Sequence, residues 1–325
     1  MTRIFGGAQV QRGFIAFFCA ILQSRGKRQR SGVHIVATSA LLVVVVAITF
    51  GINIWSARTN LLNDAEEDSQ LLTSLAESQV ASALGTTSLV LAAVQDSARR
   101  GSAALQSRFG EIDALQEERR RLLPLESDVL VIDSLGNTIM ETGGRIRAPA
   151  GMSDRDFFRH HRDNRSNADF VGKPFLSTRT GHMAFTLSRR IEDAAGRFNG
   201  VVVASIDIPW LEATFGRLKS HYGGGFLLAR NDGIVLARGP HVDGVVGKSM
   251  KDTPLFNRHL RESPAGSYRK ARFADNVEPI FGYSTLANFP LVVSVGLNQA
   301  DVLGTWYCQK TAYALMAAAL MTVLV

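Results

Sequence analysis

The chain has 325 residues, of which 46% are hydrophobic and 20% charged; this composition excludes a disordered protein, and the length suffices for two packed modules. Its net charge of +7 does not indicate nucleic-acid binding, because residues 1–57 carry six basic and no acidic side chains and so account for nearly all of the excess. The two cysteines, Cys19 and Cys308, leave the segment between them without a thiol, which excludes a disulfide framework or a cysteine-based metal site there.

The first expected element is a transmembrane helix at residues 33–55. The uncharged run around it supplies the roughly 20 apolar residues that a helix needs to span a bilayer. A basic cluster from Arg25 to Arg30 lies directly before it, so the positive-inside rule places residues 1–32 in the cytoplasm. A cleaved signal peptide has the same order of regions, but its apolar core is only about 7 to 15 residues long. We therefore favour a retained anchor.

A long amphipathic helix is expected next, at residues 58–123. Leucine, alanine, glutamate and glutamine dominate it, and its apolar residues recur at mostly helical spacing. The pattern allows one helix or two, with a bend at Gly85 or Gly101, and Pro124 ends it. The apolar stripe is typical of a helix that packs on its own domain. A helix leaving a bilayer is also aligned to meet a second copy, so we expect a homodimer through this helix.

The segment at residues 124–208 predicts a first module. A hairpin is expected at 128–140 with Gly136 and Asn137 in its turn, then a short helix at 154–165. Two longer strands, at 183–191 and 198–208, follow. A long helix followed by an antiparallel sheet with a helical flap indicates an α+β fold.

The same order recurs at residues 209–304. An Asn231-Asp232-Gly233 turn joins two strands, a helical piece follows at 254–261, and three further strand-like runs end near Val295. We therefore predict two related modules in tandem.

The last expected element is a second transmembrane helix at residues 305–325. Trp306 and Tyr307 introduce a nearly uniform apolar run, and Lys310 is placed to reach the membrane interface. Since the run stops at a membrane helix, we expect this helix to be incomplete and the reading frame to continue into a cytoplasmic part.

This arrangement and several short motifs resemble the double Cache (dCache) sensor region of bacterial transmembrane receptors, which contains two tandem PAS-like modules. The resemblance covers about residues 35–325. The motifs are Asp154-Arg155-Asp156-Phe157-Phe158, Thr180-Gly181, Leu187-Ser188-Arg189-Arg190-Ile191, Gly200-Val201-Val202, Ile206-Asp207-Ile208 and Arg230-Asn231-Asp232-Gly233. It implies that the membrane-distal module, residues 124–208, holds a small-molecule ligand and that the membrane-proximal module, residues 209–304, relays the change.

The resemblance also implies site residues. In the amino-acid-binding subgroup an arginine, two aromatic residues and two aspartates hold the ligand, and Arg155, Phe157, Phe158 and Asp207 are similar to four of these. Where that subgroup has its other aspartate, this chain has Ser177. The loss of that carboxylate removes a partner for an ammonium group, so a free amino acid is not the expected ligand.

The residues themselves favour an anionic ligand. Arginine and histidine crowd the stretch from Asp154 to Ile208, and arginine binds carboxylates with paired, charge-assisted hydrogen bonds. Arg189 therefore joins the candidate ligand-binding residues, with Arg155 as the principal one. Neighbouring His160 and His161 diverge by about 100° on a helix, so we expect no metal site. A small organic anion or carboxylate is the expected ligand.

The sequence thus predicts a multi-pass protein of the bacterial inner membrane with residues 58–304 in the periplasm. It would sense a small molecule and signal to a cytoplasmic diguanylate cyclase or histidine kinase domain beyond Val325. A membrane-anchored ectoplasmic enzyme and a structural protein without a signalling role are the alternatives. No catalytic residue and no cofactor are expected within residues 1–325, because no nucleophile elbow, zinc-protease pair or phosphate loop occurs.

Overall fold

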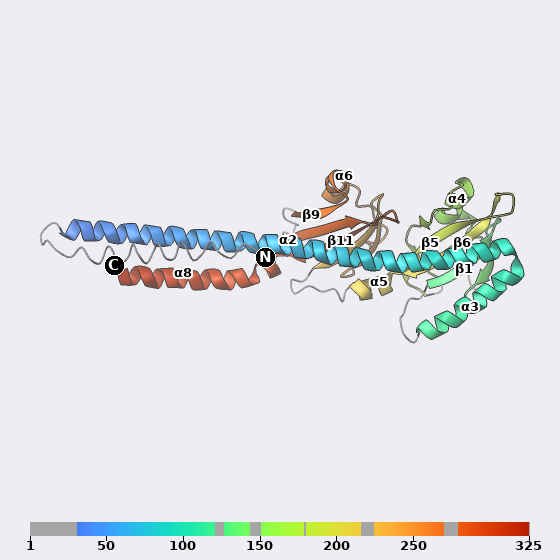
Figure 1. Cartoon of the computed structure of the whole chain (residues 1–325), viewed down its shortest axis with the longest axis horizontal. Coiled ribbons are helices and arrows are strands. Elements are labelled where there is room, and N and C mark those ends of the chain that lie inside the picture. The colour runs from blue at the N-terminus through green and yellow to red at the C-terminus, as the bar shows by residue number, and fades with distance from the viewer. Residues whose placement is uncertain are drawn as a thin grey trace, which may run out of the picture. The chain divides into compact units, whose positions relative to one another are not determined.

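The computed structural model of the chain describes residues 31–120, 127–143, 151–178, 180–215, 224–269 and 279–324. The protein divides into two compact units, Met1–Arg58 with Trp306–Val325 and Thr59–Thr305. The second unit contains two antiparallel sheets (Figure 1). The predicted α+β class, with a long N-terminal helix and two antiparallel-sheet modules, is therefore confirmed.

The long helix is broken at one glycine. Helix α2 spans Ser31–Arg100 and α3 spans Ser102–Arg120. Between them Gly101 has φ 114°, a backbone conformation that favours glycine because it has no Cβ. Of the two predicted bends only this one is present, since Gly85 lies inside α2. The end of the predicted helix at residues 58–123 lies outside the described part of the chain, as does Pro124.

In the first unit, α8 (Gly304–Leu324) contacts α2 through aromatic side chains. The indole N–H of Trp306 donates to the carbonyl of Ile54 over 3.1 Å, and the rings of Phe50 and Tyr313 meet edge to face with centroids 6.1 Å apart. Trp306 contacts Ile54, and Tyr313, later in α8, contacts Phe50, earlier in α2. The two helices therefore run antiparallel within this unit.

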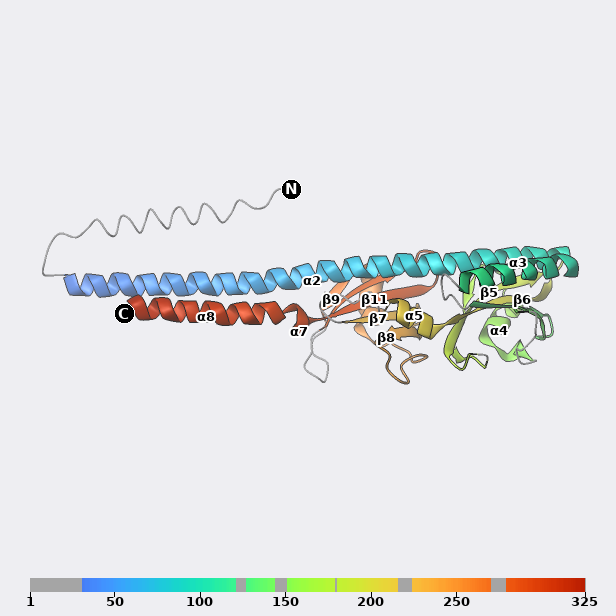
Figure 2. The ribbon, with the colours of Figure 1, turned by 90° about the horizontal axis from the view of Figure 1, so that it is seen from below.

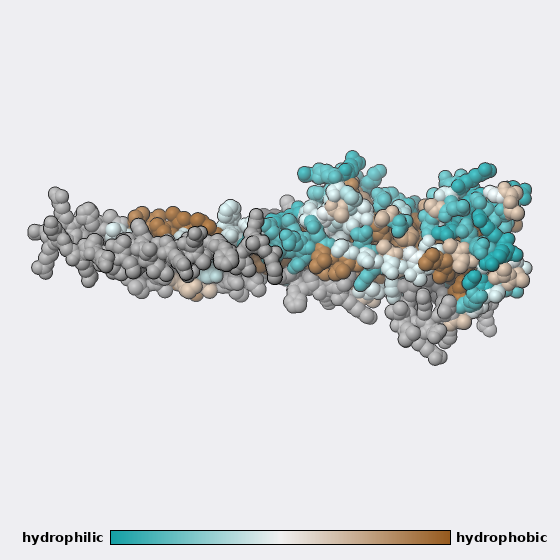
Figure 3. All heavy atoms as spheres, viewed as in Figure 1, coloured by the Kyte–Doolittle hydropathy of each residue, from teal (hydrophilic) through white to brown (hydrophobic). Residues whose placement is uncertain are grey.

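The described part of the chain contains one helix that is long and apolar enough, by length and composition, to cross a membrane. It is assigned to Thr38–Arg100, and its most apolar window has a mean hydropathy of 2.2 with no residue buried. Figure 3 shows hydrophobic atoms gathered on this part of α2. Large apolar side chains exposed there are Leu41, Val44, Val45, Ile48, Ile52 and Trp55. The basic residues 1–30 that would set its orientation lie outside the described ranges.

The first module contains the sheet β2-β1-β6-β5-β3, with β4 also paired to β5. Strands β1 and β2 form the predicted hairpin, and β5 and β6 are joined by the predicted turn, in which Gly196 N–H donates to Asp193. The elements are β1 (Ser127–Asp133), β2 (Thr138–Glu141), the 3₁₀ turn η1 (Met152–Asp154), α4 (Asp156–Asp163), β3 (Phe170–Val171), β4 (Phe175–Leu176), β5 (Met183–Glu192) and β6 (Phe198–Asp207).

The second module repeats this order in the sheet β8-β7-β11-β10-β9. Where the sequence predicted one short helix, the chain forms a π-helical turn, η2, followed by α6. The elements are α5 (Ile208–Phe215), β7 (Gly225–Arg230), β8 (Val235–Gly239), η2 (Leu255–His259), α6 (Leu260–Glu262), β9 (Ala265–Arg269), β10 (Pro279–Thr285), β11 (Leu291–Asn298) and α7 (Gln299–Val302).

One apolar core joins both sheets to α2. Figure 2 shows α2 along one side of both sheets, with α4 on the opposite side of the first. Alternate strand residues such as Leu187, Val202 and Val293 share this core with Val80 and Leu91 of α2. The other face of each sheet is covered by short helical elements, α4 in the first module and η2 with α6 in the second. A ligand site in either module would lie on that second face.

Candidate functional site

A cavity of about 270 Å³ opens between the sheet of the first module and its helical flap. Its floor comes from β1, β5 and β6, and its rim comes from η1, the start of α4 and the segment before and within β4. The lining residues are Leu130, Ile132, Met152, Asp154, Arg155, Asp156, Phe157, Lys173, Pro174, Phe175, Thr186, Val203 and Ser205.

Two hydroxyl side chains stand on the cavity floor. Thr186 of β5 and Ser205 of β6 are directly opposite each other in the antiparallel register, so both project from the same face. The neighbouring Phe185 and Ala204 point to the α2 core, as strand alternation requires. The floor is therefore polar at this pair and apolar around it, at Ile132 and Val203.

The hydroxyl of Thr186 has no hydrogen-bond partner among the described residues, although Thr186 is only 3% exposed. A buried polar group without a partner costs about 1 to 3 kcal/mol. The close neighbour of this hydroxyl is Gly172, where a Cβ would collide with it. Thr186 lines the cavity, but this oxygen is itself buried against Gly172, so a bound molecule reaches it only if the backbone at Gly172 shifts.

Both cations of the cavity lie on its rim. Arg155 occupies the N-cap of α4 and is exposed, with its guanidinium carbon 5.2 Å from the ring centroid of Phe175. Lys173 is the second cation. Of the two rim carboxylates, Asp154 is almost fully solvated and lies 3.3 Å from the guanidinium of Arg159.

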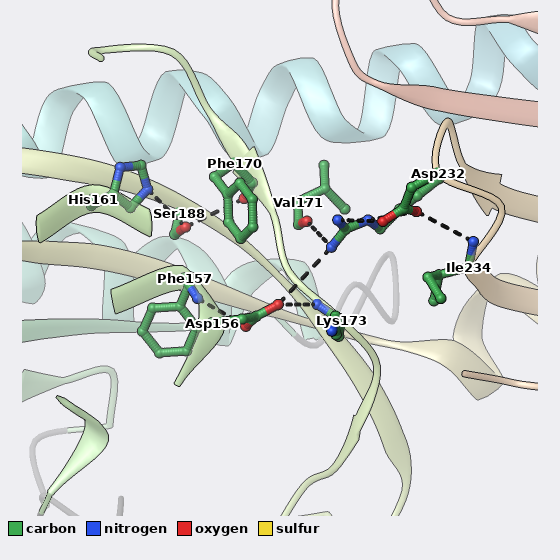
Figure 4. A network of polar contacts seen from close by, with 10 residues as sticks. Asp156, Phe157, His161, Phe170, Val171, Lys173, Ser188, Asp232 and Ile234 are labelled. Carbon is green, nitrogen blue, oxygen red and sulfur yellow. Dashed lines mark hydrogen bonds and ion pairs between the residues drawn. The ribbon is translucent and has the colours of Figure 1, made fainter. Parts of the chain in front are cut away.

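Asp156 is the second rim carboxylate and holds the rim together. One of its oxygens accepts the N–H of Phe157 over 2.8 Å, and the other accepts the N–H of Lys173 over 2.7 Å. The latter oxygen also lies 4.0 Å from the guanidinium of Arg230, which belongs to the second module (Figure 4). The negative charge of Asp156 is thus offset by protein donors.

Behind the rim, α4 is fixed to the sheet by a buried histidine. The Nε2 of His161 lies 3.0 Å from the hydroxyl of Ser188, which donates to the carbonyl of Phe170, so we assign the proton between them to Nε2. Its Nδ1 has no hydrogen-bond partner in the part of the chain that the structure describes. Burial, and then the positive charges of His160 and Arg190, lower the pKa of His161 to about 4. The imidazole is therefore neutral at physiological pH.

A second cavity, of about 350 Å³, lies where α5 meets the segment after β8. Its carboxylates Glu212 and Asp243 both contact His241, whose Nδ1 is 3.1 Å from each oxygen of Glu212. The hydrogen bond and charge of Glu212 raise the pKa of His241. These polar groups satisfy one another, so the first cavity, with its unpartnered hydroxyl, is the better candidate site.

Two of the predicted site residues line the first cavity, Arg155 and Phe157. Phe158 does not line it, because its side chain is fully buried and meets the ring of Phe198 edge to face at 5.4 Å. Arg189 lies on the opposite face of the sheet, where its guanidinium contacts Asp169 over 2.8 Å and the hydroxyl of Ser88 over 3.1 Å.

Ser177 and Asp207 lie near the far end of β5 and β6, outside the set of lining residues. Ser177 accepts the N–H of Gly181 and donates its own to the carbonyl of His182, which closes the loop before β5. Asp207 is 9% exposed, with one oxygen 3.9 Å from Nδ1 of His182. Asp207 lies two positions after Ser205, with only Ile206 between them, so both side chains leave the same face of β6.

Sequence reasoning missed the hydroxyl pair of the floor and the carboxylate of the rim. Thr186 lies between Phe185 and Leu187, and Ser205 lies between Ala204 and Ile206; a hydroxyl between apolar neighbours was the available signal. Their pairing, however, depends on the strand register, which the sequence does not display. Among the residues with described positions, no group of three His, Cys, Asp or Glu side chains is arranged to hold a metal ion.

The same fold occurs in known sensor domains. The extracellular domain of a protein assigned as the histidine kinase rpHK1S-Z16 superposes with a TM-score of 0.63 at 27% identity, over 74% of this chain and 98% of that one. The periplasmic sensory domain of the Campylobacter jejuni chemoreceptor Tlp1 gives 0.60 at 12% identity, over 75% and 98%. The ligand-binding domain of the Pseudomonas fluorescens chemoreceptor CtaA, in complex with L-isoleucine, gives 0.56 at 14%, over 77% and 99%.

No curated protein matches the chain. A family model does: dCache_1, described as a Cache domain, matches residues 56–306, which is most of the chain and includes both modules. Domains of this kind are the extracellular or periplasmic sensors of membrane receptors. With its long helix, two tandem antiparallel sheets and sensory-domain neighbours, the chain belongs to the double Cache (dCache_1) family.

Proposed function

We propose that this chain is the extracytoplasmic input region of a membrane receptor and that the cavity of the first module binds a small carboxylate. The observation that carries the proposal is a cavity whose floor pairs the hydroxyl residues Thr186 and Ser205 and whose rim carries two cations, Arg155 and Lys173. A cavity of about 270 Å³ suits a ligand smaller than most drugs, since drug-sized pockets run from about 300 to 1,000 Å³.

The charges of the rim favour an anion. Asp156 already accepts two backbone N–H groups, and Asp154 faces water, whereas Arg155 and Lys173 have donors to offer a carboxylate. Arginine can bind a carboxylate with two parallel charge-assisted hydrogen bonds. The hydroxyl of Ser205 on the floor would then hold a polar atom at the other end of the ligand.

A free amino acid is the second candidate. CtaA was solved with L-isoleucine, L-serine and L-alanine, and PctB of Pseudomonas aeruginosa with L-Gln. The carboxylate of Asp156 lines this cavity and could receive an ammonium group. We prefer a carboxylate without the ammonium because the carboxylate of Asp156 is already held by two backbone donors of the protein.

The signal would leave through the membrane helices. In this proposal residues 33–55 of α2 and the segment at residues 305–325, which contains most of α8, both cross the inner membrane. Residues 1–32 are then cytoplasmic and residues 58–304 periplasmic. Ligand binding shifts α8 and so reaches a cytoplasmic histidine kinase or diguanylate cyclase domain. A ligand can do this only through a difference in affinity between two conformations, and helix shifts of about 1 to 2 Å are an ordinary output. The similarity to a histidine kinase sensor supports this role.

A second copy of the chain is the proposed partner along α2. Three leucines of the second unit, Leu71, Leu75 and Leu89, are 59%, 48% and 72% exposed. Leu71 and Leu89 are five helical turns apart and so share one side of α2 with Leu75. Two anchored copies would present these stripes in parallel. Replacement of Leu71 and Leu89 by glutamate should convert a dimer to a monomer in analytical ultracentrifugation.

The ligand proposal is tested by calorimetric titration of the purified chain with acetate, propionate, succinate, malate, L-alanine, L-serine, L-isoleucine and L-glutamine. We expect saturable binding of a carboxylate, weakened at least about tenfold by Arg155→Ala, because one charge-assisted pair contributes about 1.5 to 3 kcal/mol.

The matched control is Arg159→Ala, which removes an exposed arginine of the same helix that pairs with Asp154 instead of lining the cavity. It should change the Kd less than about twofold, as expected for a solvated ion pair. Undiminished binding by Arg155→Ala would show that the site is wrong. Binding of amino acids alone would show that the ligand class is wrong.

A further inference from the structure

The second module contacts the rim of the cavity through one arginine. Arg230, at the end of β7, donates from Nη1 to the carbonyl of Val171 over 2.9 Å, and the same nitrogen is 4.0 Å from Asp156 (Figure 4). Its guanidinium carbon lies 5.6 Å from the ring centroid of Phe170. The side chain is only 16% exposed, so the first module covers most of it.

The guanidinium is aimed at the first module by its own hairpin. Asp232 accepts from Nε over 3.2 Å and from Nη2 over 2.8 Å, a bidentate pair that leaves Nη1 for the contacts with Val171 and Asp156. The N–H of Ile234 also donates to Asp232, which ties the turn to this carboxylate. Only a planar guanidinium offers both edges at once, so lysine could not replace it.

In the first module, Arg230 contacts the segment at residues 171–175, which forms part of the cavity rim. Val171 precedes Lys173, Pro174 and Phe175, and all of these last three line the cavity. The N–H of Lys173 is held by Asp156, so the segment and the start of α4 are fastened together at the point where Nη1 of Arg230 approaches. The segment has the cavity on one side and the second module on the other.

We propose that Arg230 is the positioning residue through which occupancy of the cavity is transmitted to the second module. The inference rests on the proposed function, in which the cavity is the ligand site. A ligand that contacts Arg155 or Lys173 changes the balance of charge around Asp156. The rim then adopts a different position, and Arg230, which is bonded to it, moves the β7–β8 hairpin. The coupling free energy equals the difference between the ligand's binding free energies in the two positions of the rim.

The test fills the cavity covalently, so it does not depend on which ligand is natural. The full chain, with Cys19→Ser and Cys308→Ser, receives Ser205→Cys on the cavity floor. Iodoacetate alkylates this thiolate with loss of iodide and leaves a carboxymethyl group in the cavity. Hydrogen exchange measured by mass spectrometry then compares peptides from the cavity rim and from the β7–β8 hairpin with and without the label.

With Arg230 present, labelling should change exchange of the hairpin amides, including those of Gly233 and Ile234, by at least about threefold, since local opening sets these rates. With Arg230→Gln the rim peptides should still respond and the hairpin should not. Arg230→Lys should resemble Arg230→Gln: lysine keeps the positive charge, but it lacks the planar guanidinium that bonds to both Asp232 and the first module. Arg258→Gln, which removes an exposed arginine paired with Glu262 on η2 and α6, is the matched control and should leave the hairpin response intact.

An unchanged hairpin in labelled protein that retains Arg230 would overturn the inference, as would an equal response in Arg230→Gln. Failure of the carboxylate screen would instead contradict the ligand class and leave this result standing. Each variant is compared at equal fractional labelling and with its own melting temperature, so a general loss of stability is recognised by faster exchange throughout the chain.

Discussion

The two modules have the same strand order and differ at the floor of the ligand face. Both carry a β-bulge at the same place, between Val131 and Ile132 in β1 and between Leu228 and Ala229 in β7. We use the bulge to align the two modules, so that Ile132 of β1 corresponds to Ala229 of β7. Their strand partners, Val201 of β6 and Val292 of β11, then correspond as well, and the register of each sheet fixes the other positions.

By this alignment, the hydroxyl pair Thr186 and Ser205 corresponds to Phe281 and Gly296 of the second module. A Cβ on Gly296 would lie 2.7 Å from the Phe281 ring, so the ring occupies the space above the glycine. Tyr268 stacks on that ring at 5.3 Å and on His259 at 4.3 Å. One fold thus holds an open floor in one copy and an aromatic filling in the other, and a single cross-strand pair accounts for much of the difference.

The largest expected effect on ligand binding comes from transferring the second module's pair to the first. Thr186→Phe with Ser205→Gly places an aromatic ring on the floor of the 270 Å³ cavity and removes the unpartnered hydroxyl. We expect the Kd for the carboxylate to rise at least about 100-fold, or about 2.7 kcal/mol, while the fold is kept because volume changes in a core cost about 1 to 3 kcal/mol. Calorimetric titration measures the Kd, and circular dichroism confirms the fold.

The matched control is Phe281→Thr in the second module. It opens the corresponding floor there and should leave the Kd of the first module within about twofold, because distant sites act independently. Full binding by the Thr186→Phe, Ser205→Gly variant would mean that the ligand binds elsewhere, and the contrast between the two floors would have no functional meaning.

The fold of both modules could be predicted from local signals, whereas the site could not. Turn residues such as Gly136, Asn137 and Gly233 mark the hairpins whatever the partner strands are. Membership of the cavity instead depends on register. Arg189 and Thr186 belong to the same strand and face opposite sides of the sheet, and a shift by one residue would exchange them. Phe157 and Phe158 are both buried in the core under α4, yet helical rotation leaves only Phe157 at the edge of the cavity.

The modules also differ in how closely α2 approaches them. Leu187 packs its side chain into the core beneath α2, and the aligned position in the second module is Gly282. A Cβ on Gly282 would collide with the carbonyl of Ser69 and the hydroxyl of Thr73. Strand β10 therefore meets the helix with backbone against backbone, as glycine inside a strand often indicates.

This contrast predicts that Gly282→Ala lowers the free energy of unfolding by about 3 kcal/mol, at the upper end for overpacking, because helix backbone cannot yield as a side chain can. Gly110→Ala is the control: that glycine lies inside α3 with open space around its Cα, and alanine there should stabilise by about 0.5 to 1 kcal/mol. Urea unfolding of the purified chain, followed by circular dichroism, measures both changes in stability. A neutral Gly282→Ala would show that β10 and α2 can separate at no cost.

The smallest expected effect concerns the histidine under each flap. In the second module His259 stacks on Tyr268 and is partly exposed, whereas in the first module His161 is fully buried against Ser188. The groups that face His161 are His160, Arg190 and Asp169, and the two cations reinforce the lowering of its pKa by burial while Asp169 opposes it.

A histidine whose pKa is lowered on folding binds fewer protons in the folded than in the unfolded chain, so its contribution to stability is present above pH 6.5 and is lost as the pH falls towards 4. Between pH 7.5 and pH 5 the protein should lose about 2 kcal/mol of unfolding free energy through this residue, since one pKa unit corresponds to about 1.4 kcal/mol. His161→Gln keeps a donor for Ser188 and removes the titration, so its stability should change less over that interval, whatever its stability at pH 7.5. His160 is the half-buried neighbour that stacks on Phe170. His160→Gln should reduce the pH dependence of the unfolding free energy less than His161→Gln does. Equal pH profiles for the wild type and His161→Gln would mean that acid opens the flap by protonating another group, and the difference between the two flaps would then lie in packing alone.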